Sequence, residues 1–258
     1  MAEVILLERF PDEHIAVLTL DRPPLNAIDE QVVTELAAAT VELAANLEIR
    51  AVLVRSALEG VFMVGADIHE FERIAAEGVE RALLAQEVFT TFAELPQPTV
   101  AAINGHALGG GLELALACDF RFLARADGTV LGLPEVRLGL LPGAGGTQRL
   151  TRLVGPGRAT ELIMKGLQLT PEQAAGAGLV HFLVEPGELE DKAREYTVRL
   201  ARQAPVALRG IKRAIRAAWS PDGLEVERDA FRKVLESEDA QTGVKAFLES
   251  EKPTFSGS

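Results

Sequence analysis

The sequence predicts an α/β protein in which a core of strands and helices is followed by a helical tail. Up to residue 184, short runs rich in apolar residues alternate with helical patterns, and from Glu188 onward the patterns are almost only helical. Hydrophobic residues occupy 48% of the 258 positions, which is enough to bury a large core. We therefore expect a core over residues 1–202 and a separate helical region over residues 203–258.

The first elements are expected to be two strands and a helix. Val4–Leu7 and Ile15–Leu20 have the composition of short strands, and a helix is predicted from the N-cap Asp29 to about Asn46. Ala51–Val54 follows as a strand of the buried type. The apolar face of the helix is expected to consist of Val33, Leu36, Ala37, Thr40 and Leu43.

The same strand-strand-helix unit returns in outline further along the chain. Strands are predicted at Pro98–Ile103 and Phe120–Leu123 with a helix near Gly111–Cys118 between them, and Val180–Val184 is the last strand. Helices are expected to start at the capping box of residues 170–173 and to cover about 188–203, 205–218, 224–237 and 240–250.

Two connections are expected to be long loops. Ser56–Asp67 and Ala126–Gly146 are both rich in glycine or proline. Loops of this length inside a compact domain are usually functional or disordered. These two segments are therefore the first places to search for a site.

The charge and cysteine content exclude several classes of protein. A net charge of -12 argues against nucleic acid or an anionic membrane as the main partner, and an anionic ligand would need a locally positive site. The single cysteine, Cys118, cannot form an intramolecular disulfide, which fits a reducing compartment. The N-terminus lacks a cationic leader, and no apolar run approaches the roughly 18 residues typical of a membrane span. We expect a soluble, cytoplasmic protein.

The most informative segment runs from Asn104 to Cys118. Three glycines at 109–111 precede a short helix that is apolar except for Glu113. Glycine permits close approach of a ligand, and the N–H groups at the start of the helix then face that gap. A carboxylate in so apolar a helix needs a partner or a purpose. The alternative is that Glu113 stabilises the helix N-terminus from a partly exposed position.

Two further segments supply candidate chemistry. Glu135 follows Pro134 in the second long loop, and two carboxyl groups at one site would suit a general acid and a general base. Ala66, between Gly65 and Asp67, offers a backbone N–H that could pair with that of Gly110 as an oxyanion hole for a carbonyl. An ordinary helix N-cap at Asp67 explains the second segment equally well.

Other motifs are absent or ambiguous. No dinucleotide, P-loop or Gly-x-Ser-x-Gly fingerprint is complete, and the four histidines show no metal-ligand spacing, so no metal is expected. One predicted helix carries a basic stripe, which is either a solvated or interface face or an anion site. The stripe consists of Arg209, Lys212, Arg213 and Arg216.

Together these segments resemble the enoyl-CoA hydratase/isomerase (crotonase) family over nearly the whole chain. The matching pieces are Leu20–Ala27, Gly65–Ile68, Asn104–Asp119 and Leu133–Leu150. The resemblance implies a crotonase-like spiral of strand-strand-helix turns and a C-terminal helical trimerisation region, with members usually trimers or dimers of trimers.

The resemblance also implies roles for individual residues. Ala66 and Gly110 would supply the oxyanion-hole N–H groups for a thioester carbonyl, and Glu113 and Glu135 would hold a water molecule between them. The substrate would be an acyl-CoA, so coenzyme A arrives with the substrate and no separate cofactor is expected. Contacts to substrate or CoA would come from Leu25, Ala66, Asp67, Ile68, His69, Gly110, Pro134, Phe247 and Lys252.

The presence of both glutamates favours hydration of a trans-2-enoyl-CoA to a 3-hydroxyacyl-CoA, as in fatty acid β-oxidation. Isomerases and hydrolases of the family typically lack a carboxylate at the position of Glu113. An isomerase or another acyl-CoA lyase is the alternative enzyme, and an RNA-binding or scaffold role is the alternative of another class, which the charge of -12 opposes.

The chain departs from the family pattern in three places. Pro23-Pro24 stands where a basic residue often precedes the Leu-Asn-Ala motif, and Arg125–Gly128 is an expected surface-turn extension. Near the C-terminus the Phe-x-Glu-Lys-Arg pattern is replaced by Phe247-Leu-Glu-Ser-Glu-Lys252, so the basic residues are absent or displaced to Lys252. These changes leave the phosphate contacts of CoA open.

Overall fold

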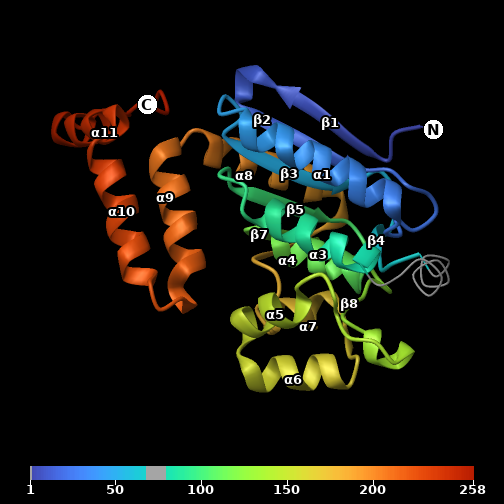
Figure 1. The fold of residues 1–258 in the computed structure, drawn as a ribbon. Helices are drawn as coiled ribbons and strands as arrows, with labels where there is room; N and C mark the ends of the chain where they lie inside the picture. The colour runs from blue at the N-terminus through green and yellow to red at the C-terminus, as the bar shows by residue number, and fades with distance from the viewer. Residues whose placement is uncertain (1, 68–79) are drawn as a thin grey trace.

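The computed structural model describes residues 2–67 and 80–258 and contains two β-sheets wrapped by helices (Figure 1). The larger sheet has six strands in the order β1-β2-β3-β5-β7-β10. β1 pairs antiparallel with β2, and the other neighbours are parallel. The strands are β1 Ile5–Phe10, β2 Ile15–Leu20, β3 Ala51–Ser56, β5 Thr99–Ile103, β7 Phe120–Ala124 and β10 Phe182–Val184.

Both faces of the central part of the larger sheet are covered, which explains why β2 and β5 are buried along their whole length. Ile15 and Val17 of β2 pack with the face that α8 (Leu189–Ala201) covers, whereas Ala16 and Leu18 belong to the main core. The main core lies between this sheet and the helices α1 (Glu30–Ala45), α3 (Glu80–Ala93) and α4 (Gly110–Ala117).

Helix α1 begins where the sequence predicts it. The Asp29 carboxylate accepts a hydrogen bond from Val32 N at 2.9 Å, as an N-cap does. The predicted buried face was wrong at two of its five positions, because alanines and valines on both sides of the stripe leave its angle ambiguous. The residues that the helix buries are Val32, Leu36, Ala39, Thr40 and Leu43.

A second sheet of four strands, in the order β4-β6-β8-β9, was not predicted. It consists of β4 Val61–Val64, β6 His106–Leu108, β8 Leu131–Gly132 and β9 Gln168–Leu169. The two long loops expected from sequence are therefore interrupted, the first by β4 and the second by β8 and the 3-10 helix η2 (Glu135–Leu138). Strands of two to four residues carry too little periodicity to be recognised.

The chain builds a spiral, as predicted. Each of three turns gives one strand to the large sheet, the next strand to the small sheet, and then a helix. The turns are β3-β4-α3, β5-β6-α4 and β7-β8-α5 (Gly146–Val154). Because β4, β6 and β8 pair in parallel, the same end of each strand lies at one edge of the small sheet.

The remaining helices extend the spiral and then leave it. α6 is Pro156–Met164, and α7 (Pro171–Gly176) begins with the predicted capping box. The helices α9 (Pro205–Arg216), α10 (Gly223–Leu235) and α11 (Glu238–Glu249) stand to one side of the two-sheet body, and the predicted boundary at residue 203 falls between α8 and α9 (Figure 1). Among the helices that the structure describes, none has the length and apolarity to cross a membrane.

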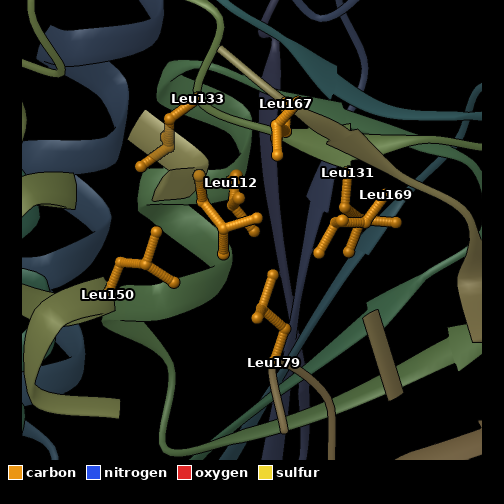
Figure 2. Close-up of a pocket in the computed structure, with 9 residues that line it drawn as sticks. Leu112, Leu131, Leu133, Leu150, Leu167, Leu169 and Leu179 are labelled. Atoms are coloured by element: carbon orange, nitrogen blue, oxygen red, sulfur yellow. The ribbon is translucent and has the colours of Figure 1, made fainter. Parts of the chain in front are cut away.

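The core contains a small cavity of about 10 Å³ between α4 and the small sheet (Figure 2). Leucine side chains such as Leu112, Leu131 and Leu179 surround it. A space of this size and apolarity holds at most about one water molecule, so it is a packing void rather than a substrate pocket.

Candidate active site

Three predicted site residues follow directly after the three parallel strands of the small sheet. β4 ends at Val64 and leads to Ala66, β6 ends at Leu108 and leads to Gly110, and β8 leads to Glu135. Parallel strands place their carboxyl ends on one edge, where ligands bind in many α/β folds. The small sheet thus brings together residues that lie far apart in the sequence.

Glycine is required where these segments meet. Gly109 has φ +55°, and a Cβ there would lie 3.2 Å from Glu135 Oε1 and 3.4 Å from Gly65 Cα. A Cβ on Gly110 would approach the Cδ1 atom of Ile28 to 2.3 Å. The glycine run therefore allows the β6–α4 turn to touch both neighbouring segments at once.

The two predicted donors lie on either side of Ile28. Ile28 forms an isolated parallel bridge with Ala66, and its side chain reaches Gly110. Gly110 is the first residue of α4, whose opening N–H groups have no partner within the helix. Within residues 2–67 and 80–258, neither the Ala66 N–H nor the Gly110 N–H donates a hydrogen bond. Both are therefore available to an acceptor; their role with substrate remains a prediction.

Glu113 is buried, with 3% of its surface exposed, so the alternative of a partly exposed helix-stabilising residue is wrong. Its Oε1 atom accepts hydrogen bonds from Ala144 N at 2.8 Å and from Gly146 N at 2.7 Å. Burial raises the pKa of Glu113, while the two amide donors and the charge of Arg149 act to lower it. The carboxylate is thus held in one position by the N-terminus of α5.

Glu135 has a different environment. Its Oε2 atom is buried and has no hydrogen-bond partner among the described residues. Burial is the main reason why the pKa of Glu135 is raised to about 7, and the negative charge of Glu113 adds to the effect. The two glutamates are therefore close enough to interact. Of the carboxyl oxygens of this pair, Glu135 Oε2 is the one that is fully buried without a partner among the described residues.

The Ala144–Gly146 donors and Arg149 were missed by the sequence analysis. The glycine-rich run at residues 143–148 was assigned to the second long loop and to the family resemblance, without a partner for its amides. A buried carboxylate needs donors, and glycines that open a helix are a frequent source of them. That argument could have paired this run with Glu113.

Asp67 is held by an ion pair. Its Oδ2 atom lies 3.1 Å from Arg22 Nη2, and the same guanidinium lies 2.8 Å from the Asp29 carboxylate. The predicted contacts Ile68 and His69 lie outside the described residues.

The remaining predicted substrate contacts are divided between the two parts of the chain. The Leu25 side chain is exposed and its carbonyl accepts from Val64 N at 3.0 Å, next to β4, and Pro134 immediately precedes Glu135. Phe247, on α11, and Lys252, three residues beyond that helix, are exposed. Helix α11 lies far from the small sheet within one chain (Figure 1). A single chain therefore does not bring these last two residues to the glutamates.

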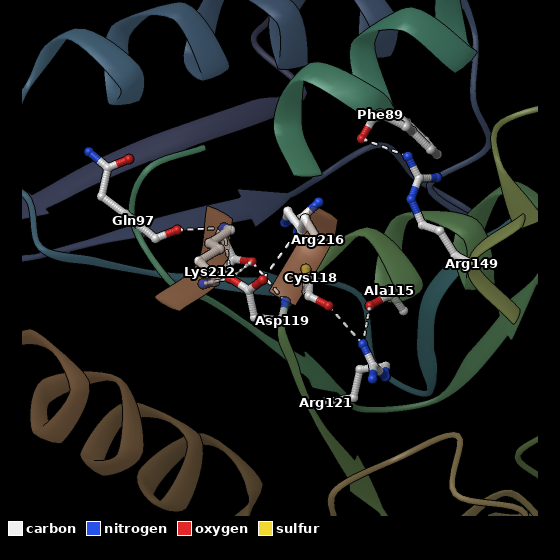
Figure 3. A network of polar contacts seen from close by, with 10 residues as sticks. Phe89, Gln97, Ala115, Cys118, Asp119, Arg121, Arg149, Lys212 and Arg216 are labelled. Atoms are coloured by element: carbon white, nitrogen blue, oxygen red, sulfur yellow. Dashed lines mark hydrogen bonds and ion pairs between the residues drawn. The ribbon is translucent and has the colours of Figure 1, made fainter. Parts of the chain in front are cut away.

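The opposite end of α4 carries a second polar cluster (Figure 3). Asp119 accepts hydrogen bonds from Thr99 N and Oγ1, and forms ion pairs with Lys212 at 2.7 Å and Arg216 at 3.1 Å. Arg121 is buried and donates to the carbonyls of Ala115, Cys118 and Leu179. Two members of the basic stripe thus dock α9 onto the core, and they are not free for an external anion.

Similarity to known proteins agrees with this geometry. The profile of the family described as Enoyl-CoA hydratase/isomerase matches residues 11–258. The chain is 38% identical over 253 residues to the Short-chain-enoyl-CoA hydratase of Clostridium acetobutylicum, covering 96% of this chain and 95% of that one. It is 36% identical over 258 residues to the Crotonyl-CoA hydratase of Syntrophomonas wolfei, covering 98% of each.

A solved structure of an enoyl-CoA hydratase from Bacillus anthracis is similar as well, with a TM-score of 0.92, 38% identity, and coverage of 99% of this chain and 100% of that one. The chain belongs to the enoyl-CoA hydratase/isomerase family, whose enzymes act on acyl-CoA substrates. Its spiral is the crotonase fold.

Proposed function

We propose that the protein is an enoyl-CoA hydratase that adds water to a trans-2-enoyl-CoA and yields a 3-hydroxyacyl-CoA, as in fatty acid β-oxidation. The observation that carries the proposal is the contrast between the two glutamates. Glu113 is fixed by two amide donors beside a guanidinium, which suits a carboxylate that accepts a proton. Glu135 has a pKa of about 7 and a free carboxyl oxygen, which suits a group that delivers one.

The proposed reaction uses one water molecule held between the two carboxyl groups. Glu113 takes a proton from the water as its oxygen bonds to C3 of the substrate, and the electrons of the C2–C3 double bond move toward the thioester carbonyl. Glu135 gives its proton to C2 as the carbonyl re-forms. Transfer of a proton from Glu113 to Glu135 by way of solvent then restores the starting state, so the net change is the addition of water.

The thioester oxygen becomes negative during this reaction and needs hydrogen-bond donors. In the proposal these are the N–H groups of Ala66 and Gly110. One such donor is worth about 2.7–4 kcal/mol in the transition state. No further cofactor is required, because coenzyme A is part of the substrate.

We also propose that the chain works in the cytoplasm as a trimer or a dimer of trimers. The support is the apolar surface of α9 and α10, where Ile211, Ile215 and Leu224 are more than half exposed in the single chain. Sedimentation should give three or six chains, and Ile215→Asp should shift the population to smaller species. A stable monomer of the intact chain would contradict this assembly.

The function is tested with the purified protein and crotonyl-CoA. Loss of the absorbance of the conjugated thioester, with formation of 3-hydroxybutyryl-CoA, is the expected result. Longer trans-2-enoyl-CoAs then define the preferred chain length. If crotonyl-CoA is stable but a 3-enoyl-CoA is converted to the 2-enoyl isomer, the protein is an isomerase; salt-sensitive binding of RNA without either activity would favour the non-enzymatic alternative.

A further inference from the structure

Arg149 forms a strap between the loop that holds Glu113 and helix α3. Its Nη1 atom donates to the carbonyl of Ala144 at 2.6 Å, and its Nη2 atom donates to the carbonyl of Phe89 at 3.2 Å. Figure 3 shows the guanidinium directed at Phe89, well apart from the cluster around Asp119. Phe89 is fully buried, so the strap ends on a rigid part of the core.

The loop that Arg149 holds is the one that binds Glu113. Ala144 donates its N–H to Glu113 Oε1 at 2.8 Å and accepts from Arg149 through its carbonyl. The backbone between Ala144 and Gly146 has φ +101° at Gly145, and a Cβ there would lie 2.2 Å from Arg149 Nη1. Only glycine therefore lets the guanidinium lie against this turn. A second tie to α3 comes from Gln86, whose amide donates to Gly143 O at 3.0 Å.

We propose that Arg149 is the positioning residue of Glu113: it fixes the Gly143–Gly146 loop, whose amides hold the Glu113 carboxylate, against α3. The consequence for the reaction rests on the proposed function, whereas the effect on Glu113 itself does not.

The electrostatics around Glu113 point the same way. Two charged side chains of the described residues interact with it, Arg149 from α5 and Glu135 from η2, and Arg152 and Arg216 lie near enough to influence Arg149. Burial raises the pKa of Glu113, and the positive charge of Arg149 opposes that rise. Loss of the Arg149 charge would therefore move the pKa of Glu113 further upward.

The test compares three variants. Arg149→Met removes the charge and every hydrogen bond of the guanidinium, including a long one of 3.5 Å to Thr90 Oγ1. Arg149→Lys keeps a charge but loses the paired contacts with Ala144 and Phe89, and Arg152→Met is the control on an exposed position of the same helix. We expect Arg149→Met to lower kcat by at least about 10-fold with little change in KM, because a small displacement of a catalytic group reduces the chemical step. The acidic limb of its pH–rate profile should move to higher pH. Arg149→Lys should lose rate with a smaller shift of that limb, and Arg152→Met should resemble the wild type.

A second measurement does not depend on activity. Carboxyl-labelled glutamate NMR, assigned with Glu113→Gln, follows the titration of Glu113 directly in each folded variant. An upward shift of the Glu113 titration in Arg149→Met but not in Arg152→Met supports the proposal even if crotonyl-CoA is not hydrated. An unchanged titration together with wild-type kcat would overturn it. If Arg149→Met does not fold, an Arg149→Lys protein with wild-type rate and titration would overturn it equally.

Discussion

Polar groups lie at both ends of the eight-residue helix α4, and the two ends differ in whether these groups have hydrogen-bond partners. At the C-terminal end, Asp119 and Arg121 each have several partners, and the nearly buried Lys212 pairs with Asp119 and donates to the Gln97 carbonyl. At the N-terminal end, the N–H of Gly110 has no acceptor among the described residues and Glu135 Oε2 has no donor. We call the C-terminal end the saturated end, because most of its polar groups have partners, and the N-terminal end the open end, because two of its polar groups have none.

The difference separates structure from chemistry. A saturated cluster contributes to docking of α9, whereas an unsatisfied buried group is a cost that folding alone does not explain. Two atoms at the C-terminal end depart from this pattern, since Arg216 Nε and Gln97 Oε1 have no partner among the described residues. Changes at the N-terminal end are expected to alter activity, and changes at the C-terminal end to lower stability.

The largest effect is expected from the glutamates at the open end. Glu113→Gln and Glu135→Gln should each lower kcat by at least about 10²-fold, because each removes a general acid–base group. Since both act on one water, the double variant should lose far less than the product of the single losses. Steady-state kinetics with crotonyl-CoA measures this, with circular dichroism and oligomer size as controls. Full activity in either single variant would rule out the two-carboxylate mechanism.

The next effect concerns the Gly110 N–H. Because any Cβ on Gly110 meets the Cδ1 atom of Ile28, the test is made in an Ile28→Val background, which removes that atom. There, Gly110→Ala keeps the donor and Gly110→Pro removes it. We expect the proline variant to lose about 10²–10³-fold more kcat than the alanine variant. Equal rates in two folded proteins would show that this N–H does not bind the carbonyl.

At the saturated end the expected effect is on stability. Asp119→Ala leaves Lys212 and Arg216 without their carboxylate, and it should lower the free energy of unfolding by about 2–3 kcal/mol, less than for a fully buried pair because Arg216 reaches solvent. The kcat of the folded protein should stay near that of the wild type. Denaturant unfolding and the hydration assay measure the two quantities. A large loss of kcat without a loss of stability would contradict a purely structural role for this end of α4.

The smallest effect is a gain in stability at the open end. Glu135 has a pKa of about 7 in the folded chain against an ordinary value of 4.5, so its stabilising contribution is complete below pH 4.5 and is lost as the pH rises through 7. Glu135→Gln stays neutral, so it should be more stable than the wild type above pH 7 by about 1–2 kcal/mol, a value reduced for partial exposure to solvent. The gain should vanish near pH 4.5. A variant that is less stable at pH 8 would contradict this sign.

The sequence predicts the strands of the large sheet, the helices α1 and α4, and the helices from α7 onward, because their signals are local. It does not predict α3, α5 and α6. Asp29 caps α1 as expected, whereas the spiral of strand-strand-helix turns was implied by the family resemblance. The small sheet could not be predicted from local patterns, since its strands have two to four residues and are defined only by their neighbours. Yet this sheet is what brings Ala66, Gly110 and Glu135 to one edge.

The candidate site shows the same division. Glu113 and Glu135 were identified from their segments and the family resemblance, but their different environments depend on tertiary contacts. The donors Ala144 and Gly146 lie more than 30 positions from Glu113, and the role of Arg149 depends on the carbonyl of Phe89. No spacing rule in the sequence connects these residues. A search for partners of each buried carboxylate would have been the closest substitute.

The single thiol of the chain, Cys118 at the C-terminal end of α4, is a probe of local opening of this helix. Cys118 is 3% exposed, and burial raises its pKa to about 12, so the thiolate needed for alkylation hardly forms in the folded protein. Labelling therefore requires the C-terminal end of α4 to separate from its surroundings, and the rate of adduct formation reports the population of that open form when reclosing is faster than alkylation. Because each chain carries one cysteine, one added mass marks one labelled chain. A substrate analogue bound beside Gly110 should lower the alkylation rate of Cys118 only if the whole of α4 opens as one unit.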